Sequence, residues 1–243
     1  MRLAFSWLTV LPVRVDRVDA AAGRTAIAVA PVVGLVLSGI AVLALFTMDA
    51  LGMPGLLAGL LTVGLLAALT RGMHLDGLAD TADGFGCYGP PERALAVMRD
   101  GGCGPFAVIT LVVVIGVQAS ALGAVVPDRW GAVPLAVVAG RAAFVLACRR
   151  GVPAARPEGL GALVAGSQRP GVAAAWWLGL AAAGALAMWE WWWLGILAVG
   201  LAAATVLVLV WHARHRFGGV TGDVLGAAGE LATTAVLAVC TIS

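Results

Sequence analysis

The sequence GPFAVITLVVVIGVQASALGAVV, residues 104–126, contains no charged side chain. Its length is close to the 20 or so apolar residues that a helix needs to cross a hydrocarbon core about 30 Å thick. Six further apolar stretches of similar length occupy residues 26–48, 51–70, 131–148, 171–188, 191–211 and 224–242. The sequence therefore predicts an all-α, polytopic membrane bundle of about seven transmembrane helices.

The composition of the whole chain agrees with this prediction. Of the 243 residues, 61% are hydrophobic and only 12% are charged, whereas about 25% of the residues of a soluble domain are charged. A water-soluble globule is therefore excluded, and we expect a single integral membrane domain over residues 1–243. The net charge of +2 indicates no nucleic-acid partner. The four cysteines form no C-x-x-C pair, so no zinc knuckle or disulfide framework is expected.

The arginines gather in four connecting segments, at residues 1–25, 71–103, 149–170 and 212–223, which hold thirteen of the fifteen. If the spans alternate in direction, these segments share one side of the bilayer. The positive-inside rule makes that side cytoplasmic. We therefore expect a multi-pass protein of the cytoplasmic (inner) membrane, with a cytoplasmic N-terminus and three cytoplasmic connections at about 71–103, 149–170 and 212–223.

The N-terminal segment is apolar from Ala4 to Val13 and is followed by four charged residues, Arg14, Asp16, Arg17 and Asp19. These charges argue against a cleaved signal peptide. The apolar part is too short to cross a bilayer, so it is expected to lie in the membrane interface.

An acidic motif follows the second predicted span, in GMHLDGLADTADG, residues 72–84. If the helix continues through it, Asp76, Asp80 and Asp83 lie at i, i+4 and i+7 on one face. Carboxylates placed this way repel one another, and their oxygens suit Mg²⁺, which commonly accompanies phosphorylated substrates. An ordinary solvated loop is the alternative, but the regular spacing favours a metal site. His74 is either a general base or a cap of a helix end.

A second acidic cluster lies in GGVTGD, residues 218–223, with Glu230 seven residues further on. Asp223 and Glu230 share a helix face, and Glu230 lies inside a predicted span, where an ionisable residue is a functional candidate. A structural ion pair with Arg141, near the middle of the fourth span, is the alternative. We hypothesise that one pocket holds Asp223, Glu230 and Arg141.

Further arginines are candidate phosphate ligands because guanidinium groups bind phosphate oxygens with two hydrogen bonds. Arg149 and Arg150 begin a connection rich in glycine and proline, and Arg99 lies in the connection at residues 71–103. The arginines at 149 and 150 are explained equally well by the positive-inside rule.

Four segments together resemble the cobalamin synthase family, the adenosylcobinamide-GDP ribazoletransferases: FSWLTVLP (5–12), GMHLDGLADTADG (72–84), MRDGGCG (98–104) and GGVTGDVLGA (218–227). The resemblance implies that adenosylcobinamide-GDP is joined to α-ribazole or its 5′-phosphate, giving adenosylcobalamin or its phosphate and GMP, in the last steps of cobalamin biosynthesis. The substrates would be a corrinoid nucleotide and α-ribazole.

The same resemblance suggests roles for the candidate residues. Asp76, Asp80 and Asp83 would hold Mg²⁺, and Asp223 would complete the site or hold a second ion. One carboxylate or His74 would accept the proton of the ribose hydroxyl. The substrate-binding candidates are Arg99, Arg141, Arg149, Arg150 and Glu230.

The sequence also allows two alternative functions. Asp80-Thr-Ala-Asp83-Gly84 and the Gly219-x-x-x-Asp223 spacing also resemble the motif of the CDP-alcohol phosphotransferases, which synthesise lipids, although Cys87-Tyr88 stands where their Ala-Arg is expected. A transporter with Arg141 and Glu230 along its pathway is the other alternative. The sequence leaves the oligomeric state open.

Overall fold

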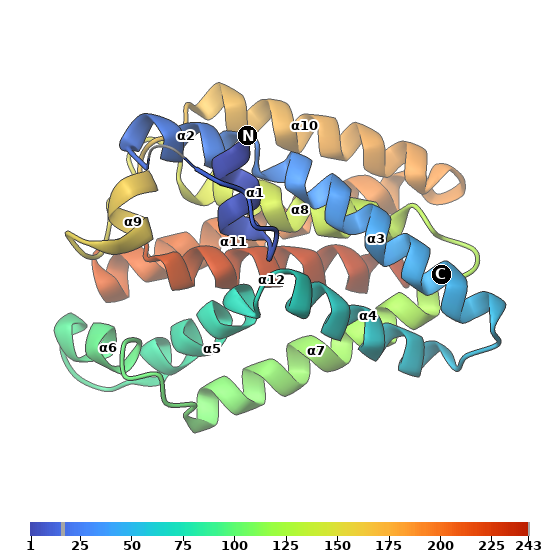
Figure 1. Ribbon diagram of the computed structural model, residues 1–243, viewed down its shortest axis with the longest axis horizontal. Helices are drawn as coiled ribbons and strands as arrows, with labels where there is room; N and C mark the ends of the chain where they lie inside the picture. The colour runs from blue at the N-terminus through green and yellow to red at the C-terminus, as the bar shows by residue number, and fades with distance from the viewer. Residues whose placement is uncertain (16–17, 243) are drawn as a thin grey trace.

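A computed structural model describes residues 1–15 and 18–242, and the regular secondary structure in these residues is helical. Two of the charged residues after the N-terminal apolar run, Asp16 and Arg17, lie outside the described residues. Most of the long helices run side by side along the longest axis of the molecule (Figure 1). They are α3 (Ala30–Ala50), α7 (Pro105–Val125), α8 (Ala132–Ala147), α10 (Pro170–Ala187), α11 (Trp192–Phe217) and α12 (Gly222–Cys240).

Two of these helices form the centre of the bundle. Helix α12 packs against α7, α8, α11 and α5 (Met73–Gly86), and α8 packs against α3, α10, α11 and α12. Almost every residue of α8 is buried, which explains how it can carry an arginine near its middle. The central position of α12 places both of its acids among other helices rather than in lipid.

Each of the seven predicted apolar stretches contains one helix, but not every helix is long enough to span by itself. Five helices pass a test of length and composition for a membrane span, namely α3, α7, α10, α11 with the short turn before it, and α12. Helices α4 (Gly55–Leu69) and α8 have 15 and 16 residues. Counting α4 and α5 as one broken span raises the total to six. The number seven therefore stays a prediction.

The acidic motif is helical, as predicted, but it forms a separate helix and does not continue the helix of the second span. Helix α5 is bent by 95° from α4, because Arg71 and Gly72 both adopt left-handed backbone angles, with φ of 57° and 67°, which a helix cannot continue through. The Arg71 guanidinium donates to the carbonyl oxygens of Ser6 at 3.2 Å and Thr9 at 2.9 Å. This elbow is thereby tied to the N-terminal helix α1 (Arg2–Leu8).

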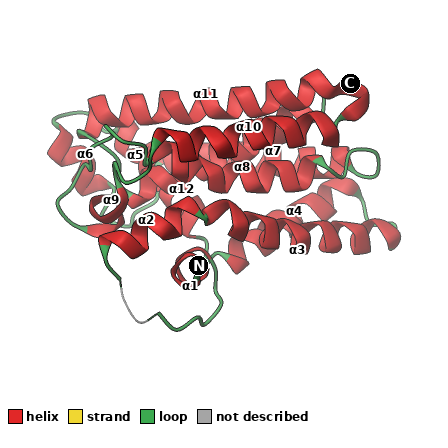
Figure 2. Ribbon diagram, turned by 90° about the horizontal axis from the view of Figure 1, so that it is seen from above, coloured by secondary structure: helices red, strands yellow, loops and turns green. Residues whose placement is uncertain are grey.

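Helix α1 crosses the other helices instead of joining them. It is seen end-on in the view in which the long helices lie in the plane (Figure 2). The backbone N–H of Val10, just after α1, donates to the Leu69 carbonyl at 2.8 Å. This crosswise orientation is the one expected of a segment that lies along the membrane interface.

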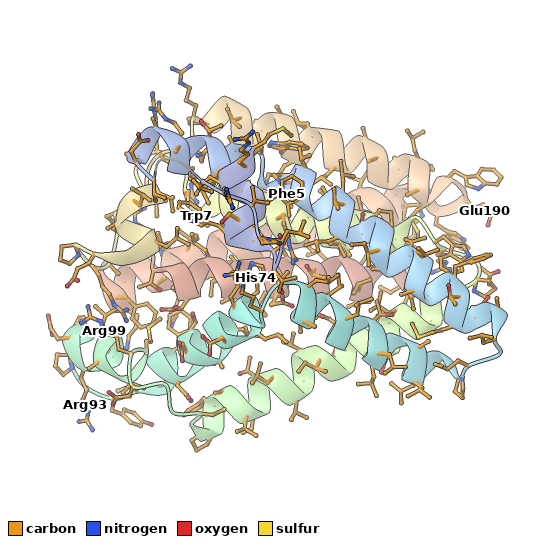
Figure 3. The ribbon with its side chains drawn as sticks, in the orientation of Figure 1. Phe5, Trp7, His74, Arg93, Arg99 and Glu190 are labelled. Atoms are coloured by element: carbon orange, nitrogen blue, oxygen red, sulfur yellow. The ribbon has the colours of Figure 1, made fainter. Side chains whose placement is uncertain are left out.

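The four arginine-rich segments meet at one end of the bundle. Arg156 donates to the Leu95 carbonyl at 2.7 Å, Gln168 donates to the Arg24 carbonyl at 2.9 Å, and Arg216 donates to the carbonyls of Cys87 and Gly89. Helices α6 (Pro91–Val97) and α9 (Gly159–Val164) lie at this end (Figure 1). Arg93 and Arg99 lie there too, whereas Glu190 lies at the opposite end (Figure 3). The segments thus share one side, as predicted, and its cytoplasmic orientation stays a prediction.

Candidate functional site

Helices α5 and α12 touch backbone to backbone, and this contact brings the two acidic segments together. A Cβ atom on Gly77 would lie 2.7 Å from the carbonyl oxygen and 2.9 Å from the Cα of Asp223. One turn further along α12, a Cβ on Gly226 would lie 3.1 Å from the Cα of His74. Only glycine allows so close an approach. The aspartates of α5 are therefore held beside Asp223.

The acids at this contact form a cluster of like charges. Asp80 is half-buried and close enough to Asp76, Asp83 and Asp223 for their charges to interact. Asp76 is exposed, and the Thr221 hydroxyl donates to Asp223 Oδ2 at 3.1 Å. Repulsion among partly desolvated carboxylates is unfavourable unless a cation offsets it.

Asp83 already has a structural role. It is buried, and its two carboxylate oxygens accept hydrogen bonds from the backbone N–H groups of Gly104 at 2.6 Å and Ala107 at 2.9 Å. These groups belong to the first turn of α7, where a carboxylate satisfies free N–H donors and interacts favourably with the helix dipole. Asp83 therefore fastens the end of α5 to the start of α7. Its predicted role as a metal ligand stays a prediction.

The remaining carboxylates supply the kind of ligand that Mg²⁺ prefers. Asp76, Asp80 and Asp223 offer hard oxygen ligands from two helices that are in direct contact. As their side chains are placed, no three His, Cys, Asp or Glu residues within 1–15 and 18–242 are grouped closely enough to hold a metal ion. The chemistry of the donor set thus fits Mg²⁺, and binding would require these side chains to converge.

His74 lies in the interior with both ring nitrogens free of hydrogen bonds. The residue is 4% exposed, and neither Nδ1 nor Nε2 has a partner among the described residues. Its ring lies 5.4 Å from that of Phe144 on α8. The interpretation of His74 as a helix cap is therefore wrong, because a cap hydrogen-bonds to free backbone groups.

A cavity of about 360 Å³ opens beside this histidine and reaches both acidic segments. Helix α1 contributes one wall, and Figure 3 shows Trp7 of α1 near His74 at the start of α5. Three of the residues that line the cavity are ionisable: His74, Asp76 and Asp223. Most of the others are apolar and come from α1, α2 (Ala20–Ala28), α8, α9 and α12: Ala4, Trp7, Leu8, Ala26, Ile27, Phe144, Leu160 and Leu225.

One arginine of the 149–170 connection that is not among the substrate-binding candidates, Arg156, interacts electrostatically with Asp80 and Asp223. Partial burial lowers the pKa of the Arg156 guanidinium, whereas the nearby charges of Asp223 and Asp80 raise it and that of Arg99 lowers it further. Arg156 thus lies within electrostatic reach of both acids. Its position depends on pairing between distant loops, including a hydrogen bond from Ala155 N to Val220 O of 3.0 Å, which leaves no local signal in the sequence.

The other predicted arginines of this connection lie elsewhere. Arg149 donates to the Leu146 carbonyl at 3.2 Å. Burial and the neighbouring Arg214 both lower the pKa of Arg149. Arg150 is exposed. The predicted phosphate ligands are therefore divided: Arg99 lies within electrostatic reach of Arg156, whereas Arg149 lies beside another arginine, Arg214.

Arg141 and Glu230 line a different, much smaller cavity of about 20 Å³. The Gln118 side chain donates to Glu230 Oε2 at 2.9 Å and to the Thr234 hydroxyl at 3.0 Å. The hypothesis that one pocket holds both of these residues together with Asp223 is wrong. Seven residues of helix separate the two acids by about 10 Å.

Comparison with known proteins gives one consistent result. The family model described as cobalamin-5-phosphate synthase matches residues 1–241. A relative from a Nocardioides species is 44% identical over 237 residues, covering 97% of this chain and 95% of its own. Relatives from Frankia casuarinae and Corynebacterium efficiens are 39% and 34% identical, covering 98% and 99% of this chain and 92% and 90% of their own. All three relatives are named adenosylcobinamide-GDP ribazoletransferase. No solved structure matches the chain at a significant level.

Proposed function

The chain belongs to the cobalamin-5-phosphate synthase family, and from this premise we propose that it transfers the adenosylcobinamide-phosphate group of adenosylcobinamide-GDP to α-ribazole or its 5′-phosphate, releasing GMP. The observation that supports this reaction best is the contact of Gly77 with the Asp223 backbone. It joins two acidic segments far apart in the sequence at the mouth of an apolar cavity. Phosphoryl transfer requires mainly such positioning and neutralisation of charge.

The transfer exchanges one phosphorus–oxygen bond for another. A ribose hydroxyl oxygen attacks the phosphorus on the cobinamide side of the diphosphate, and the bond from that phosphorus to the bridging oxygen of the GMP phosphate breaks. The hydroxyl proton passes to a carboxylate of the cluster or to His74, whose unpartnered ring nitrogens are free to accept it. The products are adenosylcobalamin, or its phosphate, and GMP.

The diphosphate needs positive charge, and we propose two sources for it. Arg156 lies within electrostatic reach of Asp80 and Asp223, and Arg99 lies within reach of Arg156, so both would bind its oxygens. Asp76, Asp80 and Asp223 would hold Mg²⁺, which when bound neutralises charge on the diphosphate and on the departing GMP. Asp83 would keep α5 in register with α7 through its two hydrogen bonds.

We propose that the reaction takes place at the cytoplasmic face of the inner membrane. The end of the bundle that holds the site also carries the arginine-rich segments, and nucleotides are available in the cytoplasm. The family match favours this reaction over synthesis of a lipid from a CDP-alcohol. A carrier role loses its main support because Arg141 and Glu230 line a cavity of only about 20 Å³, which is too small for a transported molecule.

The test is release of GMP by the purified protein in lipid nanodiscs. With adenosylcobinamide-GDP and α-ribazole, we expect GMP to appear in the presence of Mg²⁺ and to stop when EDTA is added. A CDP-activated lipid offered in place of the corrinoid nucleotide should release no CMP. Release of CMP, or undiminished turnover in EDTA, would contradict the substrate or the metal respectively.

A further inference from the structure

The cavity beneath α1 combines two kinds of lining residue. Most are apolar and include two aromatic residues, Trp7 and Phe144, and three are ionisable, Asp76, Asp223 and His74. An anionic diphosphate is poorly suited to the interior of this space because its apolar walls cannot solvate charge. The cavity therefore suits a neutral ligand with an apolar part and hydroxyl groups.

The size of the cavity distinguishes between the two substrates. Pockets of about 300–1,000 Å³ take ligands of the size of a nucleoside or a drug, and this cavity has about 360 Å³. A corrin macrocycle with its side chains and attached nucleotide is several times larger than that. A benzimidazole riboside such as α-ribazole is of the right size.

His74 gives an independent indication that a polar ligand belongs here. It lines the cavity, is 4% exposed, and has no hydrogen-bond partner at either ring nitrogen within residues 1–15 and 18–242. A buried polar group without a partner is unfavourable by about 1–3 kcal/mol. A ribose hydroxyl in the cavity would supply the missing partner.

Given the proposed transferase reaction, on which this inference rests, we propose that the cavity beneath α1 binds the acceptor nucleoside. The benzimidazole base lies against Trp7 and Phe144, and the ribose hydroxyls face His74, Asp76 and Asp223. The corrinoid nucleotide docks outside the cavity, on the side of Arg156 and Arg99. Trp7 is then a specificity-determining residue, and α1 is held in place for this task by the hydrogen bonds from Arg71 to its last turn and to Thr9.

Filling the cavity tests the proposal. Ala26 on α2 lines it, so Ala26→Phe should raise the KM for α-ribazole about tenfold or more while changing the KM for adenosylcobinamide-GDP less than about twofold. The matched control is Ala183→Phe, which enters an apolar cavity of about 390 Å³ between α8 and α10 that is lined by other residues. The control should leave both KM values unchanged.

A second pair of variants covers the event that Ala26→Phe does not fold. Trp7→Ala should raise the KM for α-ribazole about tenfold, since stacking of a base on an aromatic ring is worth about 1–3 kcal/mol, and Trp7→Phe should restore most of it. If these variants raise the KM for the corrinoid nucleotide instead, or leave the KM for α-ribazole unchanged, the cavity is not the acceptor site.

A direct measurement of α-ribazole binding tests the acceptor site independently of the proposed reaction. Equilibrium dialysis of α-ribazole against the protein in nanodiscs needs no turnover, and we expect binding that is weakened by Ala26→Phe and unaffected by Ala183→Phe. Binding without GMP release would contradict the proposed reaction while supporting the site. GMP release with α-ribazole binding insensitive to Ala26→Phe would overturn the site alone.

Discussion

Two partly buried polar regions lie on the same helix, α12, and differ in the space beside their polar groups. Asp223 faces a cavity of about 360 Å³ together with His74, whose ring nitrogens have no hydrogen-bond partner among residues 1–15 and 18–242. Glu230 accepts a hydrogen bond from Gln118 and shares a cavity of about 20 Å³ with Arg141, whose Nε also has no partner in the described part of the chain. The first region therefore has room for a ligand that supplies a missing partner, and the second does not.

This difference separates a binding site from a structural cluster. Polar groups buried away from water are unfavourable unless they find partners. In the second region Gln118 supplies a partner for Glu230, and a cavity of about 20 Å³ has no room for a ligand next to Arg141. In the first region the missing partner must come from outside. An acidic residue in a membrane helix therefore indicates a binding site only when a cavity large enough for a ligand lies beside it.

The largest expected effect comes from removing the carboxylate of Asp223, which faces the large cavity. Asp223→Asn should lower the rate of GMP release about 10³-fold, because it removes a proposed metal ligand and a negative charge next to the reacting groups. Turnover of the purified variant in nanodiscs measures this loss. The matched change on the same helix is Glu230→Gln, expected to reduce turnover less than about threefold. Equal losses in the two variants would erase the distinction between the regions.

The second prediction concerns the close contact of Gly77 on α5 with the backbone of Asp223 on α12. Gly77→Ala would place a Cβ 2.7 Å from the Asp223 carbonyl oxygen, so α5 and α12 must separate. A displacement of about 1 Å in a catalytic group reduces turnover about 100-fold, and we expect a loss of this size in kcat. Gly64→Ala on α4, where a Cβ would meet no atom within 4 Å, is the control. Full activity of Gly77→Ala would mean that the close contact is unnecessary.

The sequence predicts the helices of this molecule better than it predicts their junctions. Apolar length fixes where helices form, since the bilayer requires it, and each of the seven apolar stretches does contain a helix. Helical spacing does not reveal the elbow at Arg71 and Gly72. Its 95° bend depends on two residues in left-handed conformation and on a hydrogen bond to α1.

The candidate site shows the same limit. Helical periodicity placed Asp76 and Asp80 on one face, and the glycines at 77 and 226 are what allow that face to meet Asp223. The nearness of Arg156 to the acids arises from contacts between loops far apart in the chain, so no periodicity reveals it. The position of Arg141 near Glu230 likewise depends on how α8 packs against α12, whereas the distance between Glu230 and Asp223 follows from the helix rise alone.

The third prediction tests Asp83, which fastens the end of α5 to the start of α7. Asp83→Asn keeps the size of the side chain but leaves one acceptor oxygen for the two N–H groups of Gly104 and Ala107. Loss of a helix cap is unfavourable by about 0.5–2 kcal/mol. We expect a lower melting temperature and a decrease in turnover of about tenfold. A loss as large as that of Asp223→Asn, with an unchanged melting temperature, would instead support Asp83 as a metal ligand.

The smallest expected effect on turnover comes from the region of Arg141 and Glu230. Arg141→Met should leave kcat and both KM values within about threefold of the wild type, because Arg141 lines neither the large cavity nor the acidic cluster. It should nevertheless lower the melting temperature, because Arg141 is buried and its charge interacts favourably with that of Glu230, which the variant would leave without a compensating charge. The double variant Arg141→Met with Glu230→Gln should regain part of that stability, because it leaves no unpaired charge inside the bundle. If Arg141→Met instead raised the KM for adenosylcobinamide-GDP without changing the melting temperature, Arg141 would be a substrate ligand, and the two regions would have to act as one site.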